Sequence, residues 1–151
     1  MIAYQLSVFA ENKPGRLAAV TGILAREKIN IRATTIATSD TFGVINLIVD
    51  DPKRAQTVLS GEGLTVNLRE VLAILIEDKP GGLNKLTQML AAENININNA
   101  YGFVLQSREK AVFVVDVDQT EKARKIIEKA GFKTLDTDAL AAVEPFHYMK
   151  Y

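Results

Sequence analysis

Residues 77–97 read EDKPGGLNKLTQMLAAENINI, and residues 11–31 read ENKPGRLAAVTGILAREKINI. Aligned without gaps, the two stretches share a Lys-Pro-Gly triplet, a leucine two residues later and a closing Ile-Asn-Ile. Their offset is 66 residues, because Pro14 pairs with Pro80 (80 − 14 = 66). Self-similarity at a fixed period is the signature of a repeated supersecondary unit. The chain is therefore expected to contain one such unit twice.

The similarity resumes later in each unit with a different offset. Residues 50–64, DDPKRAQTVLSGEGL, correspond to residues 118–132, DQTEKARKIIEKAGF, which is an offset of 68 (118 − 50 = 68). Two extra residues have therefore entered the second copy. A hairpin tip near residues 107–110 is the expected place, since loop tips tolerate insertions best.

Within each unit the spacing of apolar residues switches between strand and helix. Alternation over residues 4–10 predicts a strand, and the spacing after the Pro-Gly pair predicts a helix. Residues 30–39 and 43–50 predict a hairpin. A second helix is expected from Asp51-Pro52 until a glycine ends it, followed by a strand over residues 64–70. In the second copy, Asp118 and Glu121 are predicted to form a capping box.

The element order is strand, helix, strand, strand, helix, strand. This βαββαβ unit forms a four-stranded antiparallel sheet with two helices on one face, the ferredoxin-like plan. The predicted fold class is α+β, with two such domains in tandem. Their expected bounds are 1–69 and 70–144, followed by an aromatic tail, PFHYMKY, over residues 145–151.

Several strands are apolar on both faces, which indicates association. The segments VLAILI, VINLIV and AVFVVDV lack the polar alternation of a sheet with one solvated face. The face away from the helices is expected to be buried, against the other half or against a second chain. Because large exposed apolar patches are rare in monomers, a homodimer or higher homo-oligomer is predicted.

Composition excludes several classes of function. The 151 residues carry 18 basic and 18 acidic side chains, and this balance argues against a nucleic-acid partner. There is no cysteine and one histidine, His147, so no metal site, cofactor or catalytic base is predicted and the chain is not expected to be an enzyme. The longest apolar run is far too short to span a bilayer, so a cytoplasmic protein without a membrane partner is expected.

The Pro-Gly loops suggest a binding chemistry. A helix that begins at Pro-Gly exposes free backbone N–H groups, where the helix dipole favours anions, and glycine permits close approach. Asp78 suits an ammonium group, and Asn12 can accept from one or donate to a carboxylate. The combination fits a free amino acid. The alternative, at about even odds, is that Asn12 and Asp78 are ordinary helix N-caps.

Both stretches, in their βαββαβ setting, resemble the ACT domain. The resemblance covers nearly the whole chain as a tandem pair. It implies regulatory modules that bind small ligands, chiefly amino acids, at interfaces between two such domains. In that family the loop before Pro-Gly and the asparagine that opens the second strand contact the ligand. Two edge strands can pair side by side, which brings the asparagine of one domain near the loop of its neighbour.

The resemblance thus implies a set of candidate ligand-binding residues at the loops and strand openings. In the first half these are Asn12, Lys13, Pro14, Gly15, Arg16, Leu17 and Asn30, and in the second half Asp78, Lys79, Pro80, Gly81, Gly82, Leu83, Asn96, Asn98 and Tyr101.

Some of these positions have competing interpretations. Leu17 and Leu83 are favoured as core residues, and core packing is also favoured for Tyr101. Arg16 pairs with a ligand carboxylate or is simply a solvated charge. Because Gly82 replaces that arginine in the second half, the second loop is predicted to be less crowded.

Two hypotheses follow for function. The first is a non-catalytic regulatory module that binds a free amino acid and signals to a partner, or through its own assembly. The alternative is a ligand-independent interaction or regulatory subunit of an amino-acid biosynthetic enzyme. The sequence does not choose between pairing of domains within one chain and pairing between chains.

Overall fold

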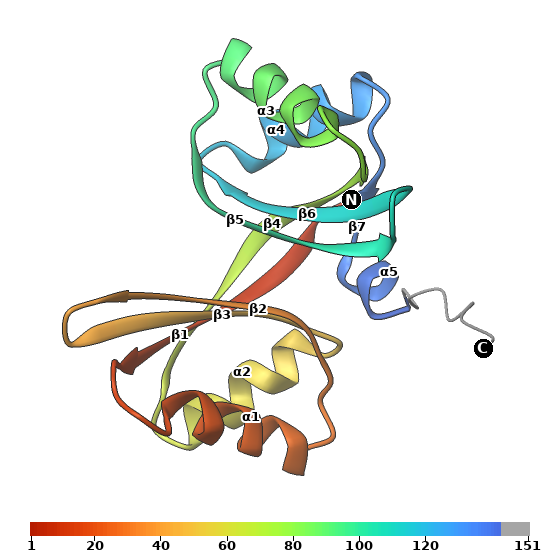
Figure 1. Cartoon of the computed structure of the whole chain (residues 1–151). Coiled ribbons are helices and arrows are strands. Elements are labelled where there is room, and N and C mark those ends of the chain that lie inside the picture. The colour runs from red at the N-terminus through yellow and green to blue at the C-terminus, as the bar shows by residue number, and fades with distance from the viewer. Residues whose placement is uncertain (143–151) are drawn as a thin grey trace. The chain divides into compact units, whose positions relative to one another are not determined.

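The computed structural model describes residues 1–142 and divides into two compact units (Figure 1). The first module is residues 4–69, and the second module is residues 1–3 with the chain from Glu70 onward. The division falls inside a single strand, β4 (Thr65–Glu77), so that no separate linker joins the modules. The predicted aromatic tail, which includes His147, lies outside the described residues.

The first module has the predicted element order. It contains β1 (Ala3–Glu11), α1 (Arg16–Arg26), β2 (Ile31–Ser39), β3 (Phe42–Val49), α2 (Pro52–Gly61) and the beginning of β4. Strand β3 pairs antiparallel with both β1 and β2, and β2 is the terminal strand. Figure 1 shows α1 and α2 together on one face of this sheet.

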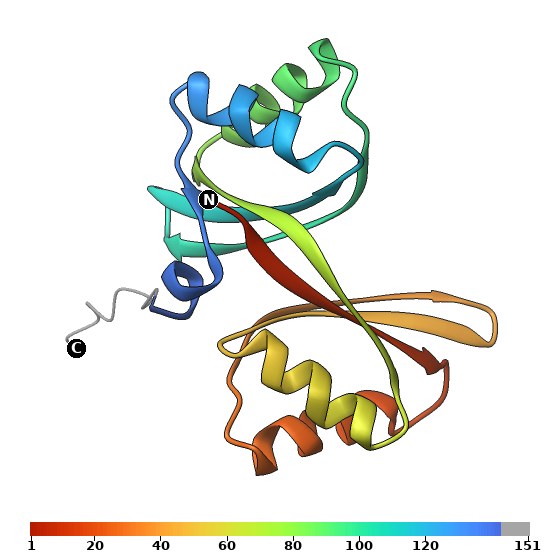
Figure 2. The same ribbon diagram turned by 180° about the vertical axis from the view of Figure 1, so that it is seen from behind.

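The second module repeats this plan with an addition at its end. It contains the rest of β4, α3 (Gly82–Ala92), β5 (Ile97–Gln106), β6 (Lys110–Val117), α4 (Thr120–Lys129), β7 (Thr134–Leu135) and α5 (Thr137–Ala142). The strand order is β5-β6-β4-β7, all antiparallel. Helices α3 and α4 cover one face, whereas α5, which was not predicted, lies on the other side of the sheet (Figures 1 and 2).

Each module has its own hydrophobic core between its sheet and its helix pair. Alternate residues of β1 and β3 meet the apolar stripes of α1 and α2, and the second module repeats the arrangement. Burying one such side chain stabilises the fold by about 1.5–3 kcal/mol relative to exposure. The fully buried core side chains include Leu6, Leu24, Leu47 and Leu59 in the first module and Leu72, Ile74, Leu86, Leu90 and Ile127 in the second.

Part of each sheet face away from the helices is also buried, although Phe9 on that face of the first module is 40% exposed. Ile48, Ala73, Val112 and Val114 have no exposed surface, yet none belongs to either core cluster. The same face of the first module holds a buried polar group that the alternation did not reveal. There Ser7 Oγ donates to Asn46 Oδ1 at 2.8 Å, and Gln5 Nε2 donates to both oxygens at 3.2 Å. These hydrogen bonds offset the cost of burying polar groups.

The helix termini confirm one predicted cap and correct another. Asp51 Oδ1 accepts from the amide of Arg54 at 3.3 Å, as expected for the N-cap of α2. The capping box predicted for α4 is wrong. Its N-cap is Gln119, without a side-chain capping bond, because Asp118 instead accepts from Asn98 Nδ2 at 2.6 Å. Glu121 Oε1 accepts a hydrogen bond from Arg124 Nε at 3.0 Å.

The two inserted residues lie where the sequence placed them. In the first module Ile36 pairs with Ile45, nine residues later (45 − 36 = 9), and the corresponding pair in the second module, Gly102 with Phe113, is eleven apart (113 − 102 = 11). A register shift just before Gln106 and a longer turn accommodate the difference.

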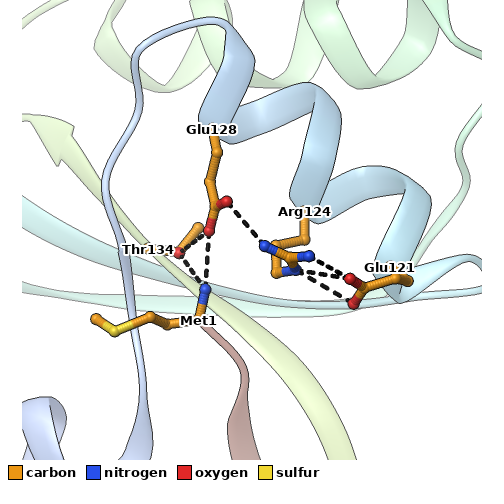
Figure 3. A network of polar contacts seen from close by, with 5 residues as sticks. All are labelled: Met1, Glu121, Arg124, Glu128 and Thr134. Atoms are coloured by element: carbon orange, nitrogen blue, oxygen red, sulfur yellow. Dashed lines mark hydrogen bonds and ion pairs between the residues drawn. The ribbon is translucent and has the colours of Figure 1, made fainter.

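A polar network binds the N-terminus to the second module (Figure 3). The α-ammonium of Met1 donates to Glu128 Oε1 at 2.8 Å and to Thr134 Oγ1 at 2.9 Å. Arg124 Nη1 donates to the other carboxylate oxygen of Glu128, also at 2.8 Å, and a second set of bonds joins Arg124 to Glu121. The Met1 ammonium and the Thr134 hydroxyl lower the pKa of Glu128 from its ordinary value of 4.5.

We expect Glu128→Gln to destabilise the protein at neutral pH and to have little effect in acid. Because the folded-state pKa lies below the unfolded value, the stabilisation is present above pH 4.5 and is lost as pH falls through the folded pKa. The side chain is 35% exposed, so solvent screening limits the loss to about 1 kcal/mol or less. Urea denaturation at several pH values measures it. Glu93→Gln is the control, because Glu93 is exposed and forms no ion pair with any residue of 1–142. Equal effects of both variants at neutral pH would contradict this account.

Candidate functional site

Both Pro-Gly loops turn the chain from a strand into a helix through a left-handed glycine. Gly15 has φ +88° and caps α1, and Gly81 has φ +86° and caps α3. Residues with a Cβ rarely adopt this conformation, which explains the glycine in each copy. Neither helix has a side-chain capping bond. The alternative in which Asn12 and Asp78 are the N-caps is therefore wrong.

The first turn of each helix presents free amide donors. The first helical bond at each loop is made by the fourth residue after the glycine, with Ala19 N donating to Gly15 O at 2.9 Å and Lys85 N to Gly81 O at 3.0 Å. The amides of Leu17 and Ala18 in α1, which come before that bond, have no acceptor within the helix. An anion at this position gains both the hydrogen bonds and the favourable end of the helix dipole.

Asn12 and Asp78 hold each loop against the tip of the neighbouring hairpin. Asn12 Nδ2 donates to the carbonyl of Asp40 at 3.0 Å, and its amide donates to Thr41 at 2.8 Å. In the second module Asp78 Oδ2 accepts from the backbone amide of Arg108 at 2.7 Å. The backbone amide of Asp78 donates to the carbonyl of Glu109 at 3.0 Å. We call this set of bonds the loop clamp. The side chain at this position is thus a donor in one module and an acceptor in the other.

The strand-opening asparagines lie far from the Pro-Gly loop of their own module. Strands β1 and β2 run parallel because both are antiparallel to β3. The loop follows Glu11, which pairs with Phe42 near the end of β2, whereas Asn30 precedes Ile31 at the other end. Nine residues of strand separate the two ends, about 26 Å at ~3.3 Å per step. Asn96 and the second loop are related in the same way. One module alone does not bring the two predicted halves of a site together.

The asparagines are engaged in local bonds at that far end. The backbone amide of Asn30 donates to Asp50 Oδ1 at 3.0 Å, and the backbone amide of Asp50 donates to the backbone carbonyl of Asn30 at 3.1 Å. In the second module Asn96 Nδ2 donates to Asn98 Oδ1 at 3.0 Å. Asn98 in turn donates to Asp118, as described above. These bonds tie the start of β2 to the end of β3, and the start of β5 to the end of β6.

A small cavity of about 100 Å³ opens at the first loop, on the side facing β2 and β3. Four of its lining residues were predicted from the sequence, namely Asn12, Lys13, Arg16 and Leu17. The others were missed because only strand register brings them to the loop: Ala10, Glu11, Ile36, Thr38, Gly43 and Ile45. The register of the hairpin formed by β2 and β3 could have revealed some of them, because it places Ile36 opposite Ile45.

The cavity has an unsatisfied donor in its wall. Arg16 Nε is buried and makes no hydrogen bond, although the guanidinium lies 3.7 Å from Glu11 Oε1. Glu11 also pairs with Lys13, at 3.3 Å between Nζ and Oε2. Buried polar atoms without a partner are uncommon in folded proteins and call for an explanation, such as a ligand acceptor.

At the second loop the start of the helix packs directly against the end of the strand. Gly82 is buried, and a Cβ added to it would overlap the carbonyl oxygen of Glu77. Protein backbone therefore fills the space that the missing side chain of Gly82 leaves, and the less crowded second loop stays a prediction. Lys79 pairs with Glu77 and lowers the pKa of that carboxyl. Leu83 was expected in the core but is 43% exposed, whereas Leu17 packs partly against the first core as expected.

Sequence comparison assigns the family. Residues 1–143 match the family described as an ACT domain pair. The chain belongs to this family. A search of curated proteins found no match.

Solved structures agree with this assignment. Protein BT0572 from Bacteroides thetaiotaomicron is 34% identical, with a TM-score of 0.87 over 94% of this chain and 97% of that one. The ligand-free regulatory subunit of aspartate kinase from Thermus thermophilus is 18% identical, with a TM-score of 0.61 over 87% and 97% of the two chains. The corresponding subunit from Thermus flavus is 17% identical, with a TM-score of 0.57 over 85% and 95%. At such low identity the two Thermus proteins support the fold alone.

Tyr101 takes a packing position in the second ACT module. It pairs with Val114, whose side chain points away from the helices, so the tyrosine lies on the face opposite α3. Burial, together with nearby Asp116, raises the pKa of its hydroxyl. Across residues 1–142, no cluster of three His, Asp or Glu side chains could hold a metal ion, and no helix is long and apolar enough to cross a membrane.

The close packing of Gly82 against the Glu77 carbonyl leads to a stability prediction. We expect Gly82→Ala to destabilise the ACT pair by about 2 kcal/mol, within the 1–3 kcal/mol typical of forced overpacking. Gly22→Ala is the matched control, because Gly22 lies inside α1 with open space at its Cβ position. That substitution should stabilise by about 0.5–1 kcal/mol. Chemical denaturation measures both changes, and a neutral Gly82→Ala would show that the helix start moves away from Glu77 at little cost.

The loop clamp predicts opposite tolerance at its two equivalent positions. Asn12→Asp removes the donor and sets a carboxylate against the Asp40 carbonyl, which should cost about 1 kcal/mol or more. Asp78→Asn keeps an acceptor for the Arg108 amide and should cost less than about half of that. Asn67→Asp, at an exposed position of β4, controls for added charge. Equal losses at Asn12 and Asp78 would contradict the clamp.

Proposed function

We propose that this ACT domain pair is a non-catalytic regulatory protein of the cytoplasm that binds a free amino acid. The ligand carboxylate occupies the first Pro-Gly loop, where it meets the amides of Leu17 and Ala18. Its binding is communicated to a partner enzyme or to the assembly of the chain itself. A ligand shifts such an equilibrium only by its preference for one arrangement, typically a few kcal/mol.

The observation that carries this proposal is the first-loop cavity with its unpaired donor. The buried Arg16 Nε lines the same cavity as the Pro-Gly loop and lacks an acceptor. A carboxylate there would satisfy that donor together with the free amides of the helix start. Glu11, already beside Arg16 and Lys13, is the carboxylate of this cavity and a partner for a ligand ammonium group.

The proposal includes a second ACT module at the site, because a cavity of about 100 Å³ is small for an amino acid. The terminal strands β2 and β5 are available for edge-to-edge pairing. Antiparallel pairing of two such edges reverses one strand relative to the other. The asparagine at the start of one strand, Asn30 or Asn96, then lies beside the loop at the end of the other. A homodimer provides this arrangement.

A second candidate function is a ligand-independent regulatory subunit of an amino-acid biosynthetic enzyme. The loop clamp favours it, because the polar side chains best suited to an amino acid, Asn12 and Asp78, already bond to the hairpin tips. In that case the loops are structural elements inherited from a binding ancestor. Recovery of the same enzyme from cell extract with and without added amino acids would favour this candidate over the first.

Calorimetric titration with each of the twenty amino acids tests the leading proposal. We expect one or a few to bind, and we expect Thr38→Phe, which fills the first cavity from β2, to weaken binding at least tenfold. Val104→Phe is the matched control, because Val104 is the equivalent residue of β5 (104 − 38 = 66) and is 54% exposed. Absence of heat and of a thermal shift with all twenty would overturn the proposal.

A further inference from the structure

The second ACT module contains a larger cavity on a different side of its Pro-Gly loop. Its volume is about 250 Å³, and it lies among the end of β4, the start of α3 and the turn that follows α4. Three lysines line it, Lys85, Lys110 and Lys133, and we call it the lysine cavity. None of the lining residues belongs to β5, so it is separate from the edge strand used in the proposed amino-acid site.

The lysine cavity carries excess positive charge. Its lining contains three ammonium groups and one carboxylate, Glu77, which is a net charge of +2. Glu77 is already paired with Lys79. In the described part of the chain none of the three lysines forms an ion pair, and Lys85 lies over the ring of Phe132, 5.6 Å from its centroid. Lys85 also acts on Glu77, whose pKa is lowered mainly by Lys79 and further by Lys85. Like charges around one cavity repel each other, and an anion between them relieves that repulsion.

The duplication shows that the fold does not require these lysines. The residues of the first module at the same places are Ala19 (85 − 66 = 19), Phe42 (110 − 68 = 42) and Thr65 (133 − 68 = 65). The first module folds on the same plan without a single cation at these positions. The positive cluster is therefore a property of the second module's cavity, which Gly82 also lines.

We propose that the lysine cavity binds a small organic dianion, a dicarboxylate or a phosphate monoester. Two negative charges match the net charge of the lining, and Leu75, Ile76 and Phe132 provide an apolar wall for a short carbon skeleton. A volume of about 250 Å³ equals that of roughly eight water molecules, which fits a ligand of about eight to ten non-hydrogen atoms. Four-carbon dicarboxylates and three-carbon phosphate esters are of this size. This site does not depend on the proposed amino-acid site.

Titration of the full ¹⁵N-labelled chain tests the proposal by NMR. The probes are succinate and glycerol 3-phosphate, added at constant ionic strength with chloride as the reference anion. We expect saturable shifts of the Gly82, Gly131 and Phe132 amides with at least one dianion. Lys110→Ala and Lys133→Ala should each weaken binding about twofold to fivefold, as loss of one solvent-exposed ion pair predicts. Shifts with only one probe identify which class of dianion the cavity takes.

The control is Lys125→Ala, which removes an exposed lysine of α4 that does not line the cavity. It should leave the affinity unchanged. An equal weakening by Lys125→Ala and Lys133→Ala would show diffuse surface attraction and overturn the proposal. Absence of saturable shifts with both probes would overturn it as well. Binding at the proposed amino-acid site would shift other amide signals, those of Leu17 and Ala18. The two proposals can therefore fail independently of each other.

Discussion

The left-handed glycine at each Pro-Gly loop is the constraint on which both modules depend. It completes the four-residue turn from the central strand into the first helix, which places the start of that helix beside the end of the strand. The loop clamp then fixes this turn to the tip of the adjacent hairpin, by a donor at Asn12 and by an acceptor at Asp78. Free helix amides and a small cavity beside β2 result from the same geometry.

Both modules keep this turn from strand to helix, but the residues around the turn differ. In the first, Arg16 follows the glycine and leaves a buried donor beside a cavity. In the second, Gly82 allows the start of the helix to approach the Glu77 carbonyl closely. The larger cavity of the second module lies instead toward the turn after α4, with three lysines around it. Two copies of one sequence motif are therefore accompanied by cavities of different size and charge.

The geometry of a single module also limits what it can bind. Parallel β1 and β2 put the loop and the strand-opening asparagine at opposite ends of the sheet, so one module cannot supply both to one ligand. A site that uses both requires a second edge strand in antiparallel orientation. Under the proposed function, a ligand that contacts both partners would stabilise their pairing.

The sequence by itself determined the duplication, the βαββαβ order and the place of the two-residue insertion, because these follow from local spacing and from backbone preferences of proline and glycine. Four of the residues that line the first cavity were among those that the family resemblance implied. Only the tertiary structure decided that Asn12 and Asp78 clamp hairpin tips, that Gly82 touches Glu77, and that Ile36 and Thr38 reach the loop. Those contacts join residues distant in sequence, and strand register and helix placement, which no local pattern encodes, decide which atoms meet.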